Sequence, residues 1–197
     1  MAFTFALIGI FILILILAIV WDKFYQKPEI RPEVRAGKQG EKEAVRIIEQ
    51  VLQEGDILLS NICVCYREKE TELDNVIINN RGVFIIEVKN YSGVLVGSED
   101  DYEWTKYKIS RGLNIYEKRV RNPMKQVKRQ VYILSRYLKC YGIRVWIDGY
   151  VLLLNNNSPI HNNMILESSK AIDQAIHRRS QNSLNKKTVA AIKELLM

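Results

Sequence analysis

Residues 72–89 decide the fold, and they read Glu-Leu-Asp-Asn-Val-Ile-Ile-Asn-Asn-Arg-Gly-Val-Phe-Ile-Ile-Glu-Val-Lys. Two apolar runs flank Asn80-Arg81-Gly82, which is typical of a hairpin turn. The pattern predicts two antiparallel strands, at residues 72–79 and 83–89. Because side chains alternate between the faces of a sheet, the second strand is expected to present one set of residues on a common face. That set is Val83, Ile85, Glu87 and Lys89.

The predicted hairpin brings two carboxylates together. A turn centred on Asn80-Arg81 places Asp74 opposite Glu87, on a face shared with Val76 and Ile78, and opposed side chains lie about 5 Å apart at Cβ. Like charges repel there unless a divalent cation lies between them, and oxygen ligands with water are typical of Mg²⁺. Lys89 would lie beside the ion, where an ammonium can stabilise charge on a phosphate. The alternative is an ordinary surface hairpin with a Glu87–Lys89 ion pair.

The rest of the chain adds helices before and after the hairpin. Apolar residues at helical spacing predict helices at residues 37–53, 122–142, 168–179 and 187–196. Further strands are expected at residues 56–66, 94–96 and 145–154, with a strand pair and loops within residues 98–116. This order predicts an α/β fold with a mixed central sheet flanked by helices on both faces.

The first 21 residues differ in composition from the rest. Residues 2–21 carry no charge, and about 20 apolar residues in a helix span a bilayer, so an N-terminal transmembrane helix is predicted. A signal peptide is the alternative, but no basic residue precedes the run and Ile19-Val20-Trp21-Asp22 is a poor cleavage site. Residues 22–34, with two prolines, are expected to form a juxtamembrane linker.

Flanking charge and cysteine usage predict the orientation of this segment. Four basic residues follow it closely, which by the positive-inside rule makes the protein a single-pass membrane protein with a cytoplasmic C-terminal domain. They are Lys23, Lys27, Arg31 and Arg35. The chain has three cysteines, an odd number that favours a reducing compartment. Its net charge of +7 favours a polyanionic partner, either nucleic acid or anionic lipid.

A family resemblance adds to this reading. Asp74, then Glu87-Val88-Lys89, resembles the core motif of the PD-(D/E)xK nuclease superfamily. The wider set resembles the NERD (nuclease-related domain) family in order and spacing over roughly residues 35–155. That set is Gly37-Lys38-Gln39-Gly40-Glu41, Glu72-Leu73-Asp74, residues 82–93, Trp104, and Asn122-Pro123 with Gln126. The resemblance implies a restriction-endonuclease-like fold for residues 35–155, with residues 156–197 as a helical extension of the same domain.

The resemblance also implies roles for individual residues. Asp74, Glu87 and Lys89 match the catalytic residues, and Asp74 and Glu87 match the metal ligands for Mg²⁺ or Mn²⁺. Glu41 matches an acidic residue that completes the metal shell. Gln126 matches a helix glutamine near the site and is predicted to contact nucleic acid, although packing at the helix start is the alternative. Its basic neighbours could hold a phosphate backbone: Lys125, Lys128 and Arg129. Leu73 stands where the superfamily motif has proline.

Together these features predict a membrane-anchored, metal-dependent nuclease, with DNA favoured over RNA as substrate. Two alternatives stay open, a nucleic-acid-binding module without turnover and a module that interacts with a membrane surface. Trp104 could stack a base, although a single Trp is more often a core residue. The sequence has no phosphate-cradling glycine-rich loop, so no nucleotide cofactor is indicated.

Overall fold

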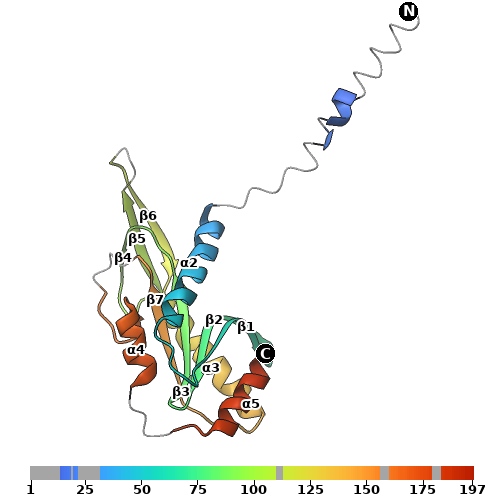
Figure 1. The fold of residues 1–197 in the computed structure, drawn as a ribbon. Coiled ribbons are helices and arrows are strands. Elements are labelled where there is room, and N and C mark those ends of the chain that lie inside the picture. Colours follow the sequence, from blue (N-terminus) through green and yellow to red (C-terminus); the bar gives the residue numbers. More distant parts are fainter. Residues whose placement is uncertain (1–13, 19, 22–31, 110–112, 156–159, 179–182) are drawn as a thin grey trace, which may run out of the picture. The chain divides into compact units, whose positions relative to one another are not determined.

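The computed structural model describes residues 14–18, 20–21, 32–109, 113–155, 160–178 and 183–197. The chain divides into two compact units, Met1–Arg35 and Ala36–Met197. Every buried side chain of the described residues lies in the second unit, which therefore contains a complete core of its own. Figure 1 shows the elements of this unit.

A five-stranded mixed sheet forms the centre of the second unit, in the order β1-β2-β3-β7-β8. β1 (Ile57–Tyr66), β2 (Lys69–Asn79) and β3 (Gly82–Lys89) are antiparallel neighbours, whereas β7 (Ile147–Leu153) and β8 (Ile165–Leu166) run parallel to β3. The predicted hairpin is confirmed, with Asn79 paired to Gly82 and the Asn79 side chain accepting the backbone N–H groups of Arg81 and Gly82. The strand β8 was not predicted.

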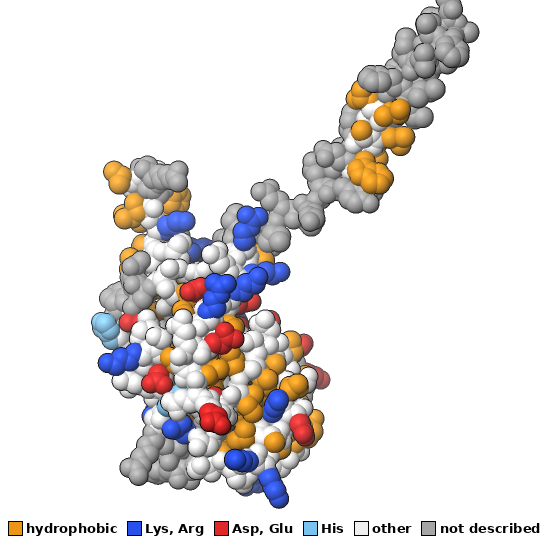
Figure 2. Space-filling model, in the orientation of Figure 1, with side chains coloured by type: hydrophobic (Ala, Val, Ile, Leu, Met, Phe, Trp, Pro, Cys, Tyr) orange, Lys and Arg blue, Asp and Glu red, His pale blue; other side chains and the backbone are white. Residues whose placement is uncertain are grey.

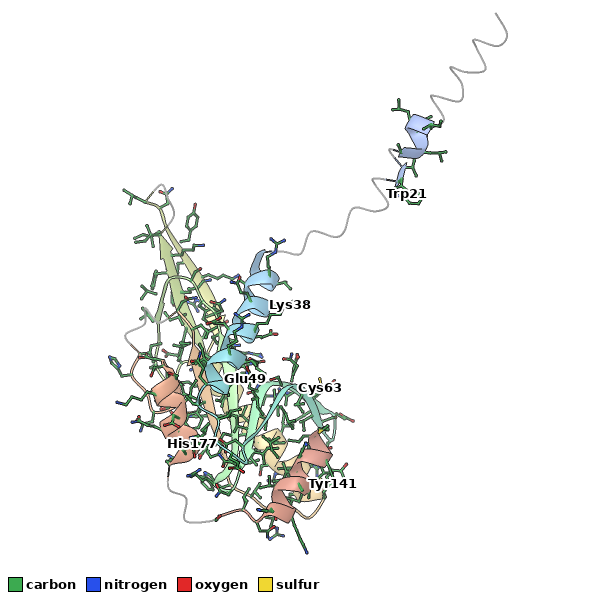
Figure 3. The ribbon with its side chains drawn as sticks, viewed as in Figure 1. Trp21, Lys38, Glu49, Cys63, Tyr141 and His177 are labelled. Atoms are coloured by element: carbon green, nitrogen blue, oxygen red, sulfur yellow. The ribbon has the colours of Figure 1, made fainter. Side chains whose placement is uncertain are left out.

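Helices cover both faces of this sheet, as the sequence predicted. On one face, α3 (Pro123–Cys140) and α5 (Lys186–Leu196) pack on Val76, Ile78, Val83 and Ile85. On the other, α2 (Pro32–Glu49) and α4 (Ser169–His177) pack on Ile77, Phe84 and Ile86. Figure 3 shows Lys38 and Glu49 towards the two ends of α2, and His177 at the end of α4. The strict alternation of β3 between two cores explains why almost all of its residues are buried.

A second, three-stranded antiparallel sheet is inserted between β3 and α3. It consists of β4 (Val94–Val96), β5 (Glu103–Ile109) and β6 (Ile115–Arg121). Trp104 anchors it, because its fully buried indole packs with Met124 of α3 and donates a hydrogen bond to the Ser98 carbonyl at 2.8 Å. Trp104 is therefore a core residue. The predicted strand pair is present, but it extends to Arg121, five residues further than expected.

Several boundaries differ from the predicted ones. The first helix begins at Pro32, so the last three residues of the predicted linker are helical instead of extended, and it ends four residues before Gln53. The long helix α3 begins as expected, because the buried Asn122 caps it by accepting the N–H of Met124. Along α3, Val131 is only partly buried, whereas Ile133 is fully buried.

The predicted transmembrane segment lies largely outside the described residues. Within it, residues 14–18, 20 and 21 are helical. Among the residues that the structure describes, no helix has the length and apolar character needed to cross a membrane.

Candidate active site

The predicted pairing of β2 with β3 is confirmed, and it ends at the expected carboxylates. Asn75 pairs with Ile86 and Val76 with Ile85, a register that continues to Asp74 opposite Glu87. The ladder stops one residue short of that pair. There, Asp74 Oδ2 accepts a hydrogen bond from the backbone N–H of Val88 at 2.7 Å. A side chain thus replaces a ladder partner, and the two strands separate where the functional residues lie.

Asp74 does not share a face with Val76 and Ile78, as simple alternation predicted. Val76 and Ile78 pack beneath α3, whereas Asp74 lines a pocket with residues of α2. Opposite Asp74 on β1, Asn61 has a left-handed φ of 56° and no ladder partner. Local interruptions of this kind re-aim side chains next to functional sites. The expected face is therefore wrong for Asp74, because a ladder distortion cannot be read from period-two alternation.

Glu87 has the face that was predicted and is enclosed by amide donors from α3. The Glu87 side chain is only 2% exposed. Its Oε1 accepts Gln126 Nε2 at 2.6 Å, and its Oε2 accepts Gln130 Nε2 at 2.6 Å. Gln130 also donates to the Glu72 carbonyl at 2.9 Å and is fully buried. Gln130 was missed by the sequence analysis, although its place one helical turn after Gln126 could have indicated it.

Lys89 completes this group of charges. Its Nζ lies 2.5 Å from Glu87 Oε1. Burial acts to lower the pKa of Lys89, but the charge and hydrogen bond of Glu87 outweigh burial and leave this pKa raised. Lys89 therefore stays an ammonium at neutral pH. It neutralises a carboxylate that would otherwise be costly to bury.

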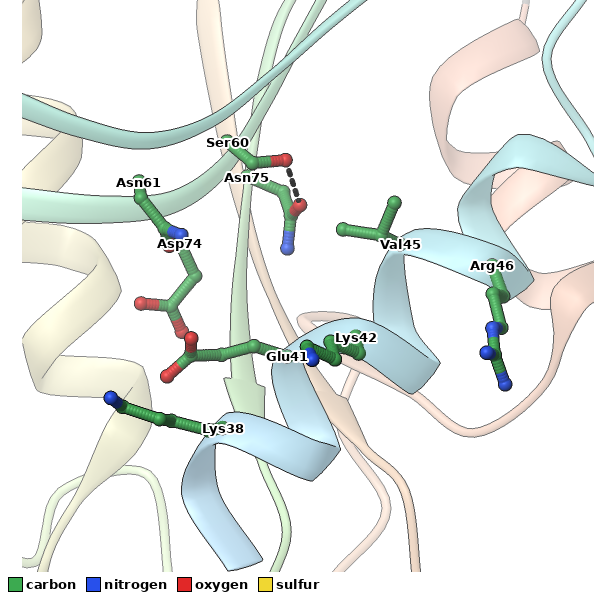
Figure 4. Close-up of a pocket in the computed structure, with 9 residues that line it drawn as sticks. All are labelled: Lys38, Glu41, Lys42, Val45, Arg46, Ser60, Asn61, Asp74 and Asn75. Carbon is green, nitrogen blue, oxygen red and sulfur yellow. Dashed lines mark hydrogen bonds between the residues drawn. The ribbon is translucent and has the colours of Figure 1, made fainter. Parts of the chain in front are cut away.

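Glu41 of α2 approaches Asp74 from the other side. Asn90, directly after β3, donates a hydrogen bond to the Ala36 carbonyl at 2.9 Å and lies so close to Gly40 that a Cβ there would meet the Asn90 Cβ at 2.6 Å. This contact holds α2 against the end of β3. Figure 4 shows the carboxylates of Glu41 and Asp74 pointing toward one another.

The environment of Asp74 disfavours its charge. Burial, followed by the Glu87 and Glu41 carboxylates, raises the pKa of Asp74 to about 6, although the Val88 N–H and Lys89 act to lower it. Asp74 and Glu41 line a pocket of about 480 Å³ between α2 and the β1–β2 pair (Figure 4). Asn75, which accepts the Ser60 hydroxyl at 2.9 Å, closes one side of it. A carboxylate held in this way is well placed to receive a cation.

Comparison with known proteins identifies the family of this domain. The nuclease-related domain (NERD) family matches residues 36–154, which is more than half of the chain. The chain belongs to the nuclease-related domain family. This family is part of the PD-(D/E)xK-like nuclease superfamily, so the domain has a nuclease-like fold.

A curated relative gives no further guidance on activity. An uncharacterized protein of Bacillus anthracis is 31% identical over 109 residues, which are 54% of this chain and 50% of the relative. The chain thus spans about half the length of this relative. No solved structure matches the chain.

The carboxylate oxygens of this site could bind a hard cation, but only some of them are available. Glu41 and one oxygen of Asp74 have no hydrogen bond among the described residues, so they offer oxygen ligands to the pocket. A carboxylate has roughly four lone-pair positions, and three of those on Glu87 are taken by Lys89, Gln126 and Gln130. In the described part of the chain, no three His, Cys, Asp or Glu residues are close enough together to hold a metal ion.

The basic residues predicted on α3 are only partly available. Lys128 Nζ lies 2.5 Å from Glu99 Oε1, and Arg129 donates to the Glu70 carbonyl at 3.1 Å. Lys125 is exposed. Gln126, predicted to contact nucleic acid, donates a hydrogen bond to Glu87 and so positions the site.

A row of cations on α2 was missed. Lys38, Lys42 and Arg46 occur at four-residue intervals and line the pocket that contains Asp74. Figure 2 shows basic side chains gathered along this helix. Their i, i+4, i+8 spacing was available in the sequence, but only the docking of α2 beside Asp74 connects it with the candidate site.

Proposed function

We propose that this nuclease-related domain is a metal-dependent nuclease that hydrolyses phosphodiester bonds in nucleic acid. The observation that carries the proposal is the meeting of Asp74, Glu87 and Lys89 where β2 and β3 separate. The site has two acidic groups and one ammonium within electrostatic reach of each other. Glu41 brings a third carboxylate from α2.

The raised pKa of Asp74 supports a divalent cation at this site. Burial raises this pKa, the nearby Glu87 and Glu41 carboxylates add to the rise, and a bound Mg²⁺ or Mn²⁺ would relieve the crowding of charge. Asp74 and Glu41 would hold the ion through their available oxygens together with water, while Glu87, held by Lys89, Gln126 and Gln130, would balance its charge without binding it directly. When bound, the ion supplies an activated water and neutralises phosphate charge.

The chain's own residues would position the substrate and balance its charge. Lys89 carries a positive charge that can stabilise the negative charge that develops on the phosphate. Gln126 and Gln130 hold Glu87 in one orientation, which preserves the geometry between turnovers. Lys38, Lys42 and Arg46 give the pocket a cationic wall to which a phosphodiester backbone can bind.

The test is a cleavage assay with the full-length chain, purified in a mild detergent. Supercoiled plasmid, linear duplex, single-stranded DNA and RNA are each incubated with Mg²⁺, with Mn²⁺ or with EDTA. We expect cleavage that requires a divalent cation. Lys89→Ala and Glu87→Gln should each reduce the rate by at least about a hundredfold, the scale of losing an electrostatic transition-state contact.

A matched control separates the site from total charge. Lys170→Ala removes an exposed lysine on α4 and should leave the rate unchanged. Circular dichroism checks that each variant is folded. Tight nucleic-acid binding without cleavage under any metal condition would contradict the proposal and support a binding module without turnover.

Membrane attachment through residues 2–21 is a separate proposal that rests on the uncharged, apolar sequence of this segment. The expected outcome is that the full chain stays with membranes after alkaline carbonate extraction, while a chain beginning at Pro28 is released. Protease added to intact cells should leave the domain uncut if it is cytoplasmic. Release of the full chain by carbonate would contradict the proposal.

A further inference from the structure

The strands β5 and β6 continue beyond β4, the third strand of their sheet, as a two-stranded ribbon. The third strand of their sheet, β4, pairs only with residues 105–107 of β5. Beyond this point Lys108 pairs with Tyr116 and Ile109 with Ile115, and all four side chains are exposed. Figure 1 shows β5 and β6 extending away from the central sheet. This part of the ribbon has no third strand beside it and buries little of its surface, so its side chains can contact a partner.

One face of the ribbon is strongly basic. Cross-strand partners share a face, and Lys106 is the partner of Lys118, with Lys108 two residues further along the same face. The Trp104–Val120 pair, which precedes the lysine pair on this face, packs into the core with Met124. The lysine face therefore continues directly from the core side of the sheet.

The same face borders the candidate active site. Lys106 Nζ lies 5.6 Å from the ring centroid of Tyr91, two residues after Lys89. Burial raises the pKa of the Tyr91 phenol, and the charges of Lys89 and Lys118 both oppose the rise, so Tyr91 lies within electrostatic reach of both lysines. The lysines of the ribbon and Lys89 of the candidate site therefore lie on either side of Tyr91 or close to it.

We propose that the lysine face of the β5–β6 ribbon is a clamp for the phosphate backbone of nucleic acid. The ligand class rests on the proposed function, but the clamp requires binding only and not cleavage. Tyr116 offers an exposed aromatic ring beside Lys108 on which a base could stack.

The apolar side chains of the ribbon lie elsewhere. Ile109 and Ile115 belong to the opposite face, at the far end, and are 66% and 70% exposed. Figure 2 shows hydrophobic side chains at that end. A membrane would engage this end first, whereas the lysine pair is one of the rungs beside Tyr91. The position of the charges therefore favours nucleic acid as the partner of the lysine face.

The test measures binding separately from cleavage. The full-length chain in EDTA is titrated into a short fluorescein-labelled duplex, and into the matching single strand, over a series of salt concentrations by fluorescence anisotropy. Lys106→Gln/Lys118→Gln removes two charges and keeps polar side chains in their place, and circular dichroism checks that the variant is folded. We expect duplex affinity to fall at least about tenfold at low salt, and the slope of log K against log salt to decrease by about 1.8.

The control Lys170→Gln/Lys193→Gln makes the same change in net charge on exposed positions of α4 and α5, and should keep the wild-type slope. If the slope falls equally in both double variants, the loss of affinity follows from net charge alone and the proposed clamp is wrong. Binding without cleavage by the wild type would refute hydrolysis and leave the clamp standing. If the wild type cleaves nucleic acid and the ribbon variant keeps the wild-type slope, the hydrolysis proposal stands and the clamp proposal is wrong.

A lipid partner is distinguished with vesicles. A chain beginning at Pro28 retains the complete core of the second unit and lacks the apolar N-terminal segment. If Lys106→Gln/Lys118→Gln abolished its binding to phosphatidylserine vesicles and left nucleic-acid affinity unchanged, the lysine face would be a lipid contact and the clamp would be wrong.

Discussion

Asp74 accepts the backbone N–H of Val88 at 2.7 Å, and this single contact both positions the carboxylate and ends the β2–β3 ladder. Without this hydrogen bond, the Asp74 side chain would follow the regular alternation of β2. With it, the carboxylate turns toward the pocket below α2 while Glu87, on the neighbouring strand, is held by α3.

Replacing Asp74 by asparagine is expected to stabilise the metal-free protein at neutral pH. The folded protein raises the pKa of this carboxyl from 3.8 to about 6, so it disfavours the charged form. The stability of the wild type should therefore fall as pH rises from about 4 to about 6, and stay level above that. The asparagine side chain would keep an oxygen for the Val88 N–H without carrying charge. We expect a gain on the order of 2 kcal/mol near pH 7.5, vanishing near pH 4, by urea unfolding in EDTA.

Mg²⁺ should reverse this ranking if the site binds it. Added Mg²⁺ would raise the unfolding midpoint of the wild type and leave that of Asp74→Asn unchanged. The exposed Asp100 supplies a control, since Asp100→Asn should match the wild type at every pH. Equal free energies of unfolding for Asp74→Asn and wild type from pH 4 to pH 8 would show that the folded protein does not raise the pKa of the Asp74 carboxyl.

Gln130→Met tests the support of Glu87. Methionine has a similar volume but no N–H group, so Glu87 Oε2 and the Glu72 carbonyl would both lose a donor. Gln130 Oε1 has no partner among the described residues, so its removal offsets part of the loss. We expect a cost of about 2 kcal/mol by urea unfolding, together with reduced cleavage. Gln126→Met, at a half-buried position, should cost less stability, and an equal cost would argue against this difference.

Two glycines of α2 should respond in opposite ways to alanine. Gly40→Ala would bring a Cβ within 2.6 Å of the Asn90 Cβ, so α2 must shift away from the end of β3. We expect lower stability and weaker cleavage, because Glu41 moves with the helix. Gly37 has no atom within 4 Å of such a Cβ, and Gly37→Ala should add about 0.5–1 kcal/mol through helix propensity. The midpoints of thermal unfolding of the two variants are compared with that of the wild type. A higher midpoint for Gly40→Ala would contradict the prediction.

His177 links α4 to the start of β1, at the opposite end of the sheet from Lys89. Its Nε2 lies 2.8 Å from Asp56 Oδ2 and its Nδ1 2.6 Å from Asp173 Oδ1. His177→Ala would leave the buried Asp56 carboxylate without its imidazole partner, at a cost of about 3 kcal/mol. Asp173 is 46% exposed, so Asp173→Asn should cost under about 1 kcal/mol. Cleavage per folded molecule should be unchanged in both, and a loss of rate would connect this end of the sheet with the site.

The register of the hairpin could be predicted because turn chemistry and strand length are local. Asn80-Arg81 set the pairing, and the pairing placed Asp74 beside Glu87. The contact of His177 with Asp56 could not be predicted, because the two residues lie 121 positions apart in the sequence. Only the spacing of Gln130, one helical turn after Gln126, could have indicated its contact with Glu87. The basic residues of α3 were assigned to nucleic acid because they are close together in the sequence. Lys128 is instead paired with Glu99, which belongs to the inserted segment before β5.

The sequence by itself determined the hairpin, its register, the helices on both faces of the sheet and the family, because these follow from local periodicity, turn residues and motif spacing. Only the tertiary structure decided that Asp74 faces α2 while Glu87 faces α3, that Lys38, Lys42 and Arg46 line the pocket, and that the lysines of β5 and β6 lie near Tyr91. These relationships depend on the docking of elements far apart in the chain and on one interrupted ladder, which local pattern does not encode.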